Sequence, residues 1–367
     1  MPRINCTIFC HSNSEHLQII YTGFRLLESQ SKINLRYQVI RKASALPIPA
    51  LSPAELFVEI EGKKQVVFDL ADFGEVKNEL LGRTDAYFKR SFPIEYSERP
   101  PSGLYPLGLA YHVNESFPSI FELRRSALER TPRQQWQSFT KSLASGLLGT
   151  SRRFFRFNIN NCYSAPDFSL PPKVIFMCRL WDPDETKPKY REQREQINQM
   201  RAECVRSLRA EFGKRFLGGL SHNDYTRKHF PDCLISDPRL TEFKNYIELM
   251  KQFPIGIATT GLHNSIGWKF AEYVAFSKAI VSEKLKYFVP ELKEGCNYLA
   301  FDCADQCVEQ TVSLMESKNL REEMMRNNHA HYLNYGRPDV MVWRALNLSL
   351  GREPSPISAS ISPFALE

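Results

Sequence analysis

The stretch from residue 255 to residue 283 constrains the fold of this chain more than any other. The short apolar run Ile255-Gly256-Ile257-Ala258 is followed by the small-residue loop Thr259-Thr260-Gly261. A polar turn and a helical pattern come next, and the run Lys278-Ala279-Ile280-Val281 closes the stretch. Strand, loop, helix and strand in this order are typical of a parallel sheet, because parallel neighbours need a crossover connection. The sequence therefore predicts an α/β fold here.

The loop in this stretch predicts a binding site for an anion. It leads into a helix, and the free backbone N–H groups and the dipole at that end favour negative charge. A loop with a purely structural role is the alternative, because many βαβ units contain a glycine at this point. If the site is functional, we expect it to be built from the loop and turn residues Gly261, His263, Asn264, Ser265 and Gly267.

Two charged residues on the helix after the loop extend this hypothesis. Lys269 and Glu272 are three positions apart and share one face near the first turns of the helix. The lysine is placed to neutralise a phosphate, and the glutamate is placed to accept hydrogen bonds from ribose hydroxyls. Together with the loop they suit a nucleoside diphosphate.

These residues resemble the donor-binding unit of GT-B glycosyltransferases, most closely the "glycosyltransferase group 1" branch. In that family a glycine-rich loop leads into a helix with a glutamate, as in Trp268-Lys269-Phe270-Ala271-Glu272-Tyr273. Many members have two glutamates eight positions apart; here Glu272 matches the second, and Asn264 occupies the position of the first. That departure leaves the stereochemical outcome of a transfer reaction open.

A second motif carries the same resemblance. Arg179-Leu180, after the predicted strand 173–178, is similar to the family's Gly-Arg-Leu turn, with Cys178 in place of the glycine. In the family this arginine binds the phosphates of the donor, so the resemblance implies that role for Arg179; an ordinary surface arginine is the alternative. The resemblance is strongest over residues 173–346 and thinner over the first 110 residues.

The chain of 367 residues is long enough for two domains. Both halves begin with a predicted strand, at residues 4–10 and 173–178. We expect two Rossmann-like α/β domains with a cleft between them, as in the GT-B design. Residues 1–150 would form the acceptor-side domain and residues 173–348 the domain that binds the nucleotide-sugar donor. The Ser/Pro-rich tail, residues 351–367, is predicted to be disordered.

Three residues of the first half are candidates for a general base. Asp69 ends the predicted strand 65–69 and Asp72 follows it, at the carboxyl end where open α/β sheets bind ligands. His16 lies at the first junction between a loop and a helix. A base of this kind would activate an acceptor hydroxyl if the enzyme inverts configuration. A helix cap is the alternative role for a strand-end aspartate, and a structural role is the alternative for the histidine.

Composition narrows the class of protein. The longest apolar runs are far shorter than the roughly 18 residues that span a bilayer, and the nine cysteines show no CxxC or zinc spacing. We expect a cytoplasmic protein without a cofactor or metal; Asp182-Pro183-Asp184 resembles an Asp-x-Asp metal motif but is interpreted as a turn. The net charge of +7 comes without a nucleic-acid-binding motif, so no nucleic-acid partner is expected.

One basic segment, Arg152-Arg153-Phe154-Phe155-Arg156-Phe157, interleaves cations with aromatic residues. It fits peripheral contact with an anionic surface at the inner face of a membrane. A solvated face with buried aromatics is the alternative, and it is the commoner role for such a segment.

The function that the sequence predicts is transfer of a sugar from a nucleotide-sugar donor to a glycan, glycolipid or surface-polysaccharide acceptor, without a metal. Three alternatives stay open. A non-catalytic protein that binds a nucleotide or polysaccharide could use the same fold. A nucleotide-sugar epimerase shares the two-domain layout. The positive charge alone would also fit a nucleic-acid binder.

Overall fold

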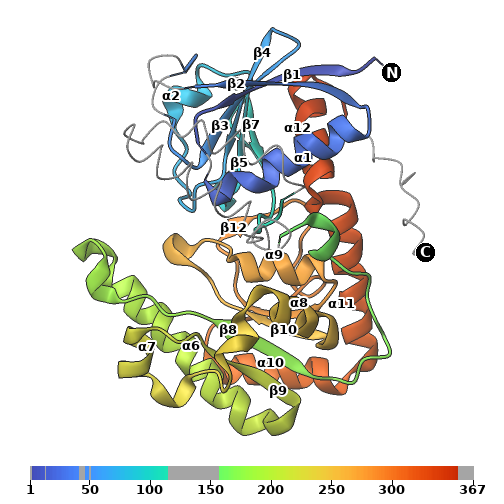
Figure 1. Ribbon diagram of the computed structural model, residues 1–367. Coiled ribbons are helices and arrows are strands. Elements are labelled where there is room, and N and C mark those ends of the chain that lie inside the picture. Colours follow the sequence, from blue (N-terminus) through green and yellow to red (C-terminus); the bar gives the residue numbers. More distant parts are fainter. Residues whose placement is uncertain (1, 13, 41–45, 49–50, 115–156, 354–367) are drawn as a thin grey trace, which may run out of the picture.

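A computed structural model describes residues 2–12, 14–40, 46–48, 51–114 and 157–353 (Figure 1). The basic segment 152–157, apart from Phe157, the charged stretch 117–145 and most of the tail lie outside these residues. The chain forms two α/β units, each built around its own sheet. The expected class of two Rossmann-like domains is therefore confirmed. No helix in the described part of the chain is long and apolar enough to cross a membrane.

The first sheet has six strands in the order β2-β1-β3-β4-β5-β7. They are β1 (Ile4–Cys10), β2 (Ile33–Val39), β3 (Glu55–Ile60), β4 (Lys64–Asp69), β5 (Ala86–Lys89) and β7 (Leu104–Pro106). β3 runs antiparallel to both of its neighbours, and the other pairs are parallel. The carboxyl ends of β1, β4 and β5 therefore lie at the same edge of the sheet.

β3 and β4 form a hairpin and pair from Glu55 opposite Asp69 to Ile60 opposite Lys64. Its turn places Glu61 and Gly62 at φ values of 54° and 63°. Two consecutive positive φ values are what a tight hairpin turn needs, because its twist then matches that of the strands. Because of this turn, β4 ends at the same edge of the sheet as β1, with Asp69 as its last residue and Asp72 in the loop that follows.

The second sheet has five strands, all parallel, in the order β13-β11-β10-β8-β9. They are β8 (Val174–Cys178), β9 (Phe216–Leu220), β10 (Ile255–Ala258), β11 (Ala279–Glu283) and β13 (Leu299–Phe301). The helices of this unit are α6 (Arg191–Phe212), α7 (Asp224–His229), α8 (Phe243–Gln252), α9 (Trp268–Ala275), α10 (Ala304–Glu316) and α11 (Lys318–His331).

The predicted βαβ unit is β10, α9 and β11, and it is confirmed. Gly256 in β10 shows why this helix lies so close to the sheet. A Cβ atom at that position would lie 2.8 Å from the ring of Tyr273 on α9, so only glycine allows this approach.

The last helix differs from the expected division into domains. We expected residues 173–348 to form one domain, but α12 (Pro338–Ser349) packs against α1 (Gln18–Ser29) of the first domain. A π-helical turn, Tyr332–Gly336, joins α11 to α12, and Pro338 begins the new helix (Figure 1). Gly23 permits the close packing, because a Cβ atom there would lie 2.2 Å from the carbonyl oxygen of Pro338.

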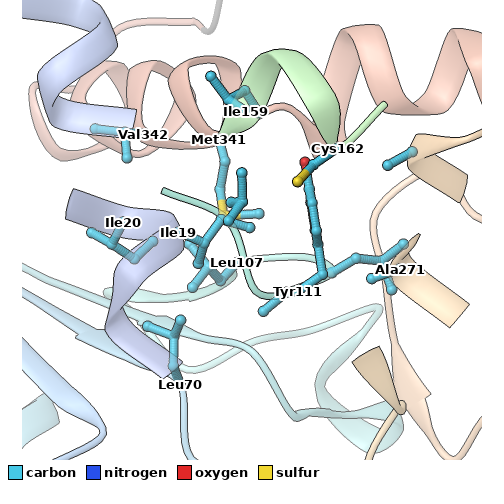
Figure 2. Close-up of a cluster of buried hydrophobic side chains, with 14 of the residues drawn as sticks. Ile19, Ile20, Leu70, Leu107, Tyr111, Ile159, Cys162, Ala271, Met341 and Val342 are labelled. Carbon is cyan, nitrogen blue, oxygen red and sulfur yellow. The ribbon is translucent and has the colours of Figure 1, made fainter. Parts of the chain in front are cut away.

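The two domains share a buried core. Ile19 and Ile20 of α1 lie in one hydrophobic cluster with Met341 and Val342 of α12, and the same cluster includes Ala271 of α9 (Figure 2). The short strands β6 (Phe92–Pro93) and β12 (Tyr287–Phe288) also pair with each other across the junction. The packing of the two domains therefore brings together the loops at the carboxyl edges of their sheets.

Candidate active site

The loop between β10 and α9, residues 259–267, is called the donor loop below. Its middle is a 3₁₀ turn, Leu262–Asn264, closed by a hydrogen bond from the Gly261 N–H to the Ser265 carbonyl oxygen at 2.8 Å. His263 and Asn264 have φ values of 60° and 59°, a region that non-glycine residues occupy at a cost. Surrounding contacts must hold this conformation in place.

The start of the donor loop is held by Arg201 of α6, which is 6% exposed. Its Nε donates to Thr259 Oγ1 at 2.9 Å, and its Nη2 donates to the Thr260 carbonyl oxygen at 3.0 Å. Its Nη1 donates to the carbonyl oxygen of Arg179, in the loop after β8, at 2.6 Å. One buried guanidinium thus ties together the loops that follow two neighbouring strands. Burial lowers the pKa of Arg201.

Glu283, the last residue of β11, holds the same point from the other side. Its Oε2 accepts hydrogen bonds from the Thr260 N–H at 2.6 Å and from Thr260 Oγ1 at 3.1 Å. Burial raises the pKa of Glu283, and the Thr260 bonds and the nearby Arg201 charge oppose that shift. Neither Glu283 nor Arg201 is among the site residues predicted from the sequence. Arg201 is one of several arginines in a highly charged helix, and nothing in the sequence distinguishes it.

Arg179 lies at the carboxyl end of β8, as the sequence suggested, and is exposed. Its guanidinium carbon is 5.5 Å from the centre of the Trp181 ring, and the Arg201 guanidinium carbon is 4.4 Å from the same ring. Two cations therefore flank one indole at the carboxyl edge of the second sheet. The buried one holds the loops, and the exposed one is accessible to a ligand.

Lys269 and Glu272 lie on one face of α9, which confirms the predicted geometry. Lys269 Nζ is 3.1 Å from Glu272 Oε2 and 3.4 Å from the centre of the Tyr246 ring. The Tyr246 hydroxyl donates to the same Oε2 at 2.9 Å. Both bonds use Oε2, so Oε1 has no partner among the residues that the structure describes. Tyr246, on α8, is a further member of this group that the sequence analysis did not identify.

The first domain reaches the donor loop through the residues after β4 and β5. Arg90, which follows β5 and is 4% exposed, donates from Nη1 to Asp72 Oδ1 at 2.7 Å. Its Nη2 donates to the Ile266 carbonyl oxygen at 2.7 Å. Phe73 stacks on the ring of His263 with 3.9 Å between centroids. The rule that selected Asp72, a polar residue just after a strand, would also have found Arg90.

The three candidate bases have different surroundings. Asp69 is 1% exposed, and its Oδ2 accepts hydrogen bonds from Lys89 Nζ at 2.7 Å and from the Tyr87 hydroxyl at 2.5 Å. This carboxylate is enclosed inside the first sheet. The side chain of Asp72 is 32% exposed, so it is open to a ligand.

His16 lies close to Asp72 and to α9. Its ring is 5.3 Å from the ring of Trp268 in an edge-on arrangement. Burial lowers the pKa of His16, and the charge of Asp72 partly opposes this effect. The same two influences act on the pKa of His263 in the donor loop, which is lowered. The structure therefore brings Asp72, His16 and His263 together at the junction, while Asp69 points elsewhere.

The Asp182-Pro183-Asp184 motif forms a turn, as predicted. Asp182 caps it by accepting a hydrogen bond from the Asp184 N–H at 2.9 Å, and Asp184 pairs with Arg191 at 2.5 Å. Over the described residues, no group of three or more His, Cys, Asp or Glu side chains is arranged to hold a metal ion.

Comparison with known proteins finds similar solved structures. No family model matches the chain, and no curated protein does. Among similar solved structures is the C-terminal domain of a glycosyl transferase group 1 family protein, LpcC, from Francisella tularensis. The TM-score is 0.33 at 11% identity, over 47% of this chain and 95% of that one.

Two other similar structures cover nearly the whole chain. Anabaena HepE in complex with UDP has a TM-score of 0.40 at 10% identity, over 94% of this chain and 99% of that one. A putative UDP-N-acetylglucosamine 2-epimerase from Listeria monocytogenes has a TM-score of 0.41 at 10% identity, over 96% and 98%.

Proposed function

We propose that this protein is a glycosyltransferase that moves a sugar from a nucleotide-sugar donor to a hydroxyl group of a glycan, glycolipid or surface polysaccharide. One observation supports the proposal above the others: residues from the carboxyl edges of both sheets meet at the donor loop. Ligands of α/β sheets bind at such edges. A site to which both domains contribute can hold two substrates side by side, as a transfer reaction requires.

The second domain would bind the donor. Arg179 and Lys269 would neutralise the diphosphate, which becomes the leaving group when the glycosidic bond to the donor breaks. A guanidinium can grip two phosphate oxygens at once, and a lysine acts as a point charge. Glu272 would accept a hydrogen bond from a ribose hydroxyl through Oε1. The part of the donor loop from Gly261 to Gly267 would place its backbone N–H groups near the phosphates.

The first domain would act on the acceptor. If configuration is inverted, we assign Asp72 as the general base that takes the proton of the attacking hydroxyl, with His16 as the next candidate. Asp69 is left out of this role because Lys89 and Tyr87 enclose its carboxylate. We propose that transfer does not need a metal, because two cationic side chains and a helix N-terminus would face the leaving group in this arrangement.

The test begins with binding. The purified protein is melted in the presence of UDP, GDP, ADP and the corresponding nucleotide sugars, because a ligand that binds only the folded state raises the melting temperature. Nucleotide sugars that bind are then incubated with glycan and glycolipid acceptors, and released nucleoside diphosphate is measured. Release that requires an acceptor supports the proposal.

Other outcomes would replace the proposal. Interconversion of the sugar without an acceptor would indicate an epimerase, and binding without turnover would indicate a non-catalytic binding protein. Failure of every nucleotide to raise the melting temperature would contradict the donor site itself. Activity that is lost with EDTA and restored by Mg²⁺ or Mn²⁺ would overturn metal independence. Acceptors offered on anionic vesicles and in free form would test peripheral membrane contact.

A further inference from the structure

Arg90 is a first-domain residue whose side chain ends in the second domain. It follows β5 directly, and its guanidinium is almost completely buried, at 4% exposure. Nη1 donates to Asp72 Oδ1 and Nη2 donates to the Ile266 carbonyl oxygen, each at 2.7 Å. A third acceptor, the Leu70 carbonyl oxygen, lies 3.5 Å from Nη1. One side chain thus joins the loop after β4 to the donor loop.

The preceding residue, Lys89, points the other way and stays within the first domain. Lys89, the last residue of β5, pairs with Asp69 at 2.7 Å inside the first domain. Successive side chains of a strand point to opposite faces, so Arg90 emerges on the other side. A buried cation is costly unless it is paired and its donors are satisfied. Asp72 supplies the opposite charge, and the Ile266 carbonyl supplies an acceptor from the other domain.

The position of Ile266 makes this contact important for the site. Ile266 comes immediately before Gly267, the N-cap of α9, and Lys269 lies in the first turn of that helix. Fixing the Ile266 carbonyl therefore fixes both the end of the donor loop and the start of the helix. Lysine could not replace arginine fully, because a planar guanidinium reaches two separated acceptors at once, whereas an ammonium is a compact point charge.

We propose that Arg90 is a positioning residue through which the first domain sets the conformation of the donor loop. The expected effect of Arg90 on nucleotide binding rests on the proposed function. Its effect on the conformation of the donor loop does not. The nucleotide site of the second domain would then be complete only when the first domain is packed against it. Arg90 itself is not required to touch the donor.

The first experiment needs no ligand. Amide hydrogen exchange is compared over peptides that cover residues 259–270 in the wild type, Arg90→Met, Arg90→Gln and Arg90→Lys. Arg90→Met should speed exchange in these peptides by about tenfold or more, because a buried charged hydrogen bond is lost. Exchange in the central strands of the second sheet should stay unchanged. Arg90→Lys should lie between Arg90→Met and the wild type.

The matched control is Arg206→Met. Arg206 is a half-exposed arginine of the second domain that bonds both carboxylate oxygens of Asp232, at 2.6 and 3.1 Å. Its loss should leave exchange in residues 259–270 unchanged. If Arg90→Met fails to fold, Arg90→Gln and Arg90→Lys decide the question. A folded Arg90 variant whose donor-loop exchange matches the wild type within twofold would overturn the inference.

The second experiment uses UDP, GDP and ADP as probes in calorimetric titrations. The nucleotide that binds the wild type should bind Arg90→Met about tenfold to a hundredfold more weakly, and Arg206→Met normally. Equal affinity in Arg90→Met and the wild type would overturn the effect of Arg90 on binding. If no nucleotide binds the wild type, the proposed function fails, and hydrogen exchange alone decides whether Arg90 positions the loop.

Discussion

The two ends of the donor loop are held in different ways. At its start, Thr259 and Thr260 are bound by Arg201 and Glu283, which both belong to the second domain. Toward its end, Ile266 is bound by Arg90, and His263 is stacked on Phe73, both from the first domain. Among the described residues, the side-chain hydrogen bonds at the start come from the domain that contains the loop. The later part is also bound within that domain, at His263 by Gln193 and Tyr287, but it depends in addition on how the two domains pack.

This difference has a functional meaning under the proposed reaction. The start of the loop lies beside Arg179, at the edge where the donor phosphates would bind, and its geometry is fixed within one domain. The end faces Asp72 and His16, which would act on the acceptor. A loop that both domains hold would link the proposed donor site to the proposed acceptor site.

The largest effect is expected from removing the basicity of Asp72. Asp72→Asn keeps the shape of the side chain and an oxygen that can accept from Arg90, but it removes the charge that pairs with this buried guanidinium. Hydrogen exchange over residues 259–270 must therefore match the wild type before a loss of turnover is assigned to the base. Turnover should fall about 10²–10⁴-fold, the usual contribution of a general base, with nucleotide affinity unchanged. Steady-state kinetics and calorimetry measure the two quantities. A fall of less than tenfold would remove Asp72 from this role and make His16→Gln the next variant to test.

The next effect concerns the start of the loop. Arg201→Met keeps most of the buried volume but leaves Thr259 Oγ1 and the carbonyl oxygens of Thr260 and Arg179 without their donor. Buried polar groups without partners are costly, so the free energy of unfolding should fall by about 3–4 kcal/mol. Urea denaturation checks this, with Arg206→Met as the control that should show little change. A stable Arg201→Met protein would show that the start of the loop is held by other contacts.

A third effect concerns His331, where the chain crosses back to the first domain. Within the part of the chain that the structure describes, neither of its ring nitrogens has a hydrogen-bond partner, and burial together with the charge of Arg344 lowers its pKa to about 4. Unfolded histidine titrates near pH 6.5. Since the unfolded state takes up the proton first, this contribution to stability is complete above about pH 6.5 and is lost toward pH 4.

His331→Leu tests this pH dependence. Between pH 7 and pH 5 the wild type should lose about 2 kcal/mol more of its free energy of unfolding than the variant does. Urea denaturation at the two pH values gives the difference, and comparison with the variant cancels the contributions of the other histidines. Equal losses in the two proteins would show that His331 is not kept neutral by burial.

The smallest effect is expected from Glu272, on α9 beyond the end of the loop. Glu272→Ala should weaken nucleotide binding by about 1–3 kcal/mol if the carboxylate bonds a ribose hydroxyl. Glu248→Ala is a suitable control, because Glu248 is an exposed residue of α8 that pairs with Lys251. Unchanged affinity in a folded Glu272→Ala protein would leave the Lys269–Tyr246–Glu272 group a structural one.

Much of the fold could be predicted from the sequence because it depends on local patterns. Apolar runs of strand length and the small-residue loop before a helix predicted β10, α9 and β11. Pro338 is the first residue of α12, in keeping with the local rule that proline begins a helix but breaks its interior, where its missing N–H is needed. The spacing of Lys269 and Glu272 predicted their shared face, since residues three apart are neighbours on a helix.

The sequence by itself thus determined the two α/β units, the donor loop and the candidate residues beside it. Tertiary structure alone decided which partner each buried face and charge would meet. An apolar face predicts that a helix is buried, but it does not predict which element the helix packs against. In this protein α12 packs against α1 of the first domain. Arg201 and Arg206 have the same side-chain chemistry and lie on the same helix, α6. They differ in burial, because Arg201 is enclosed where it binds the loop and Arg206 faces solvent. Asp69 and Asp72 lie three residues apart, yet strand geometry encloses the first and leaves the second beside the loop of the opposite domain.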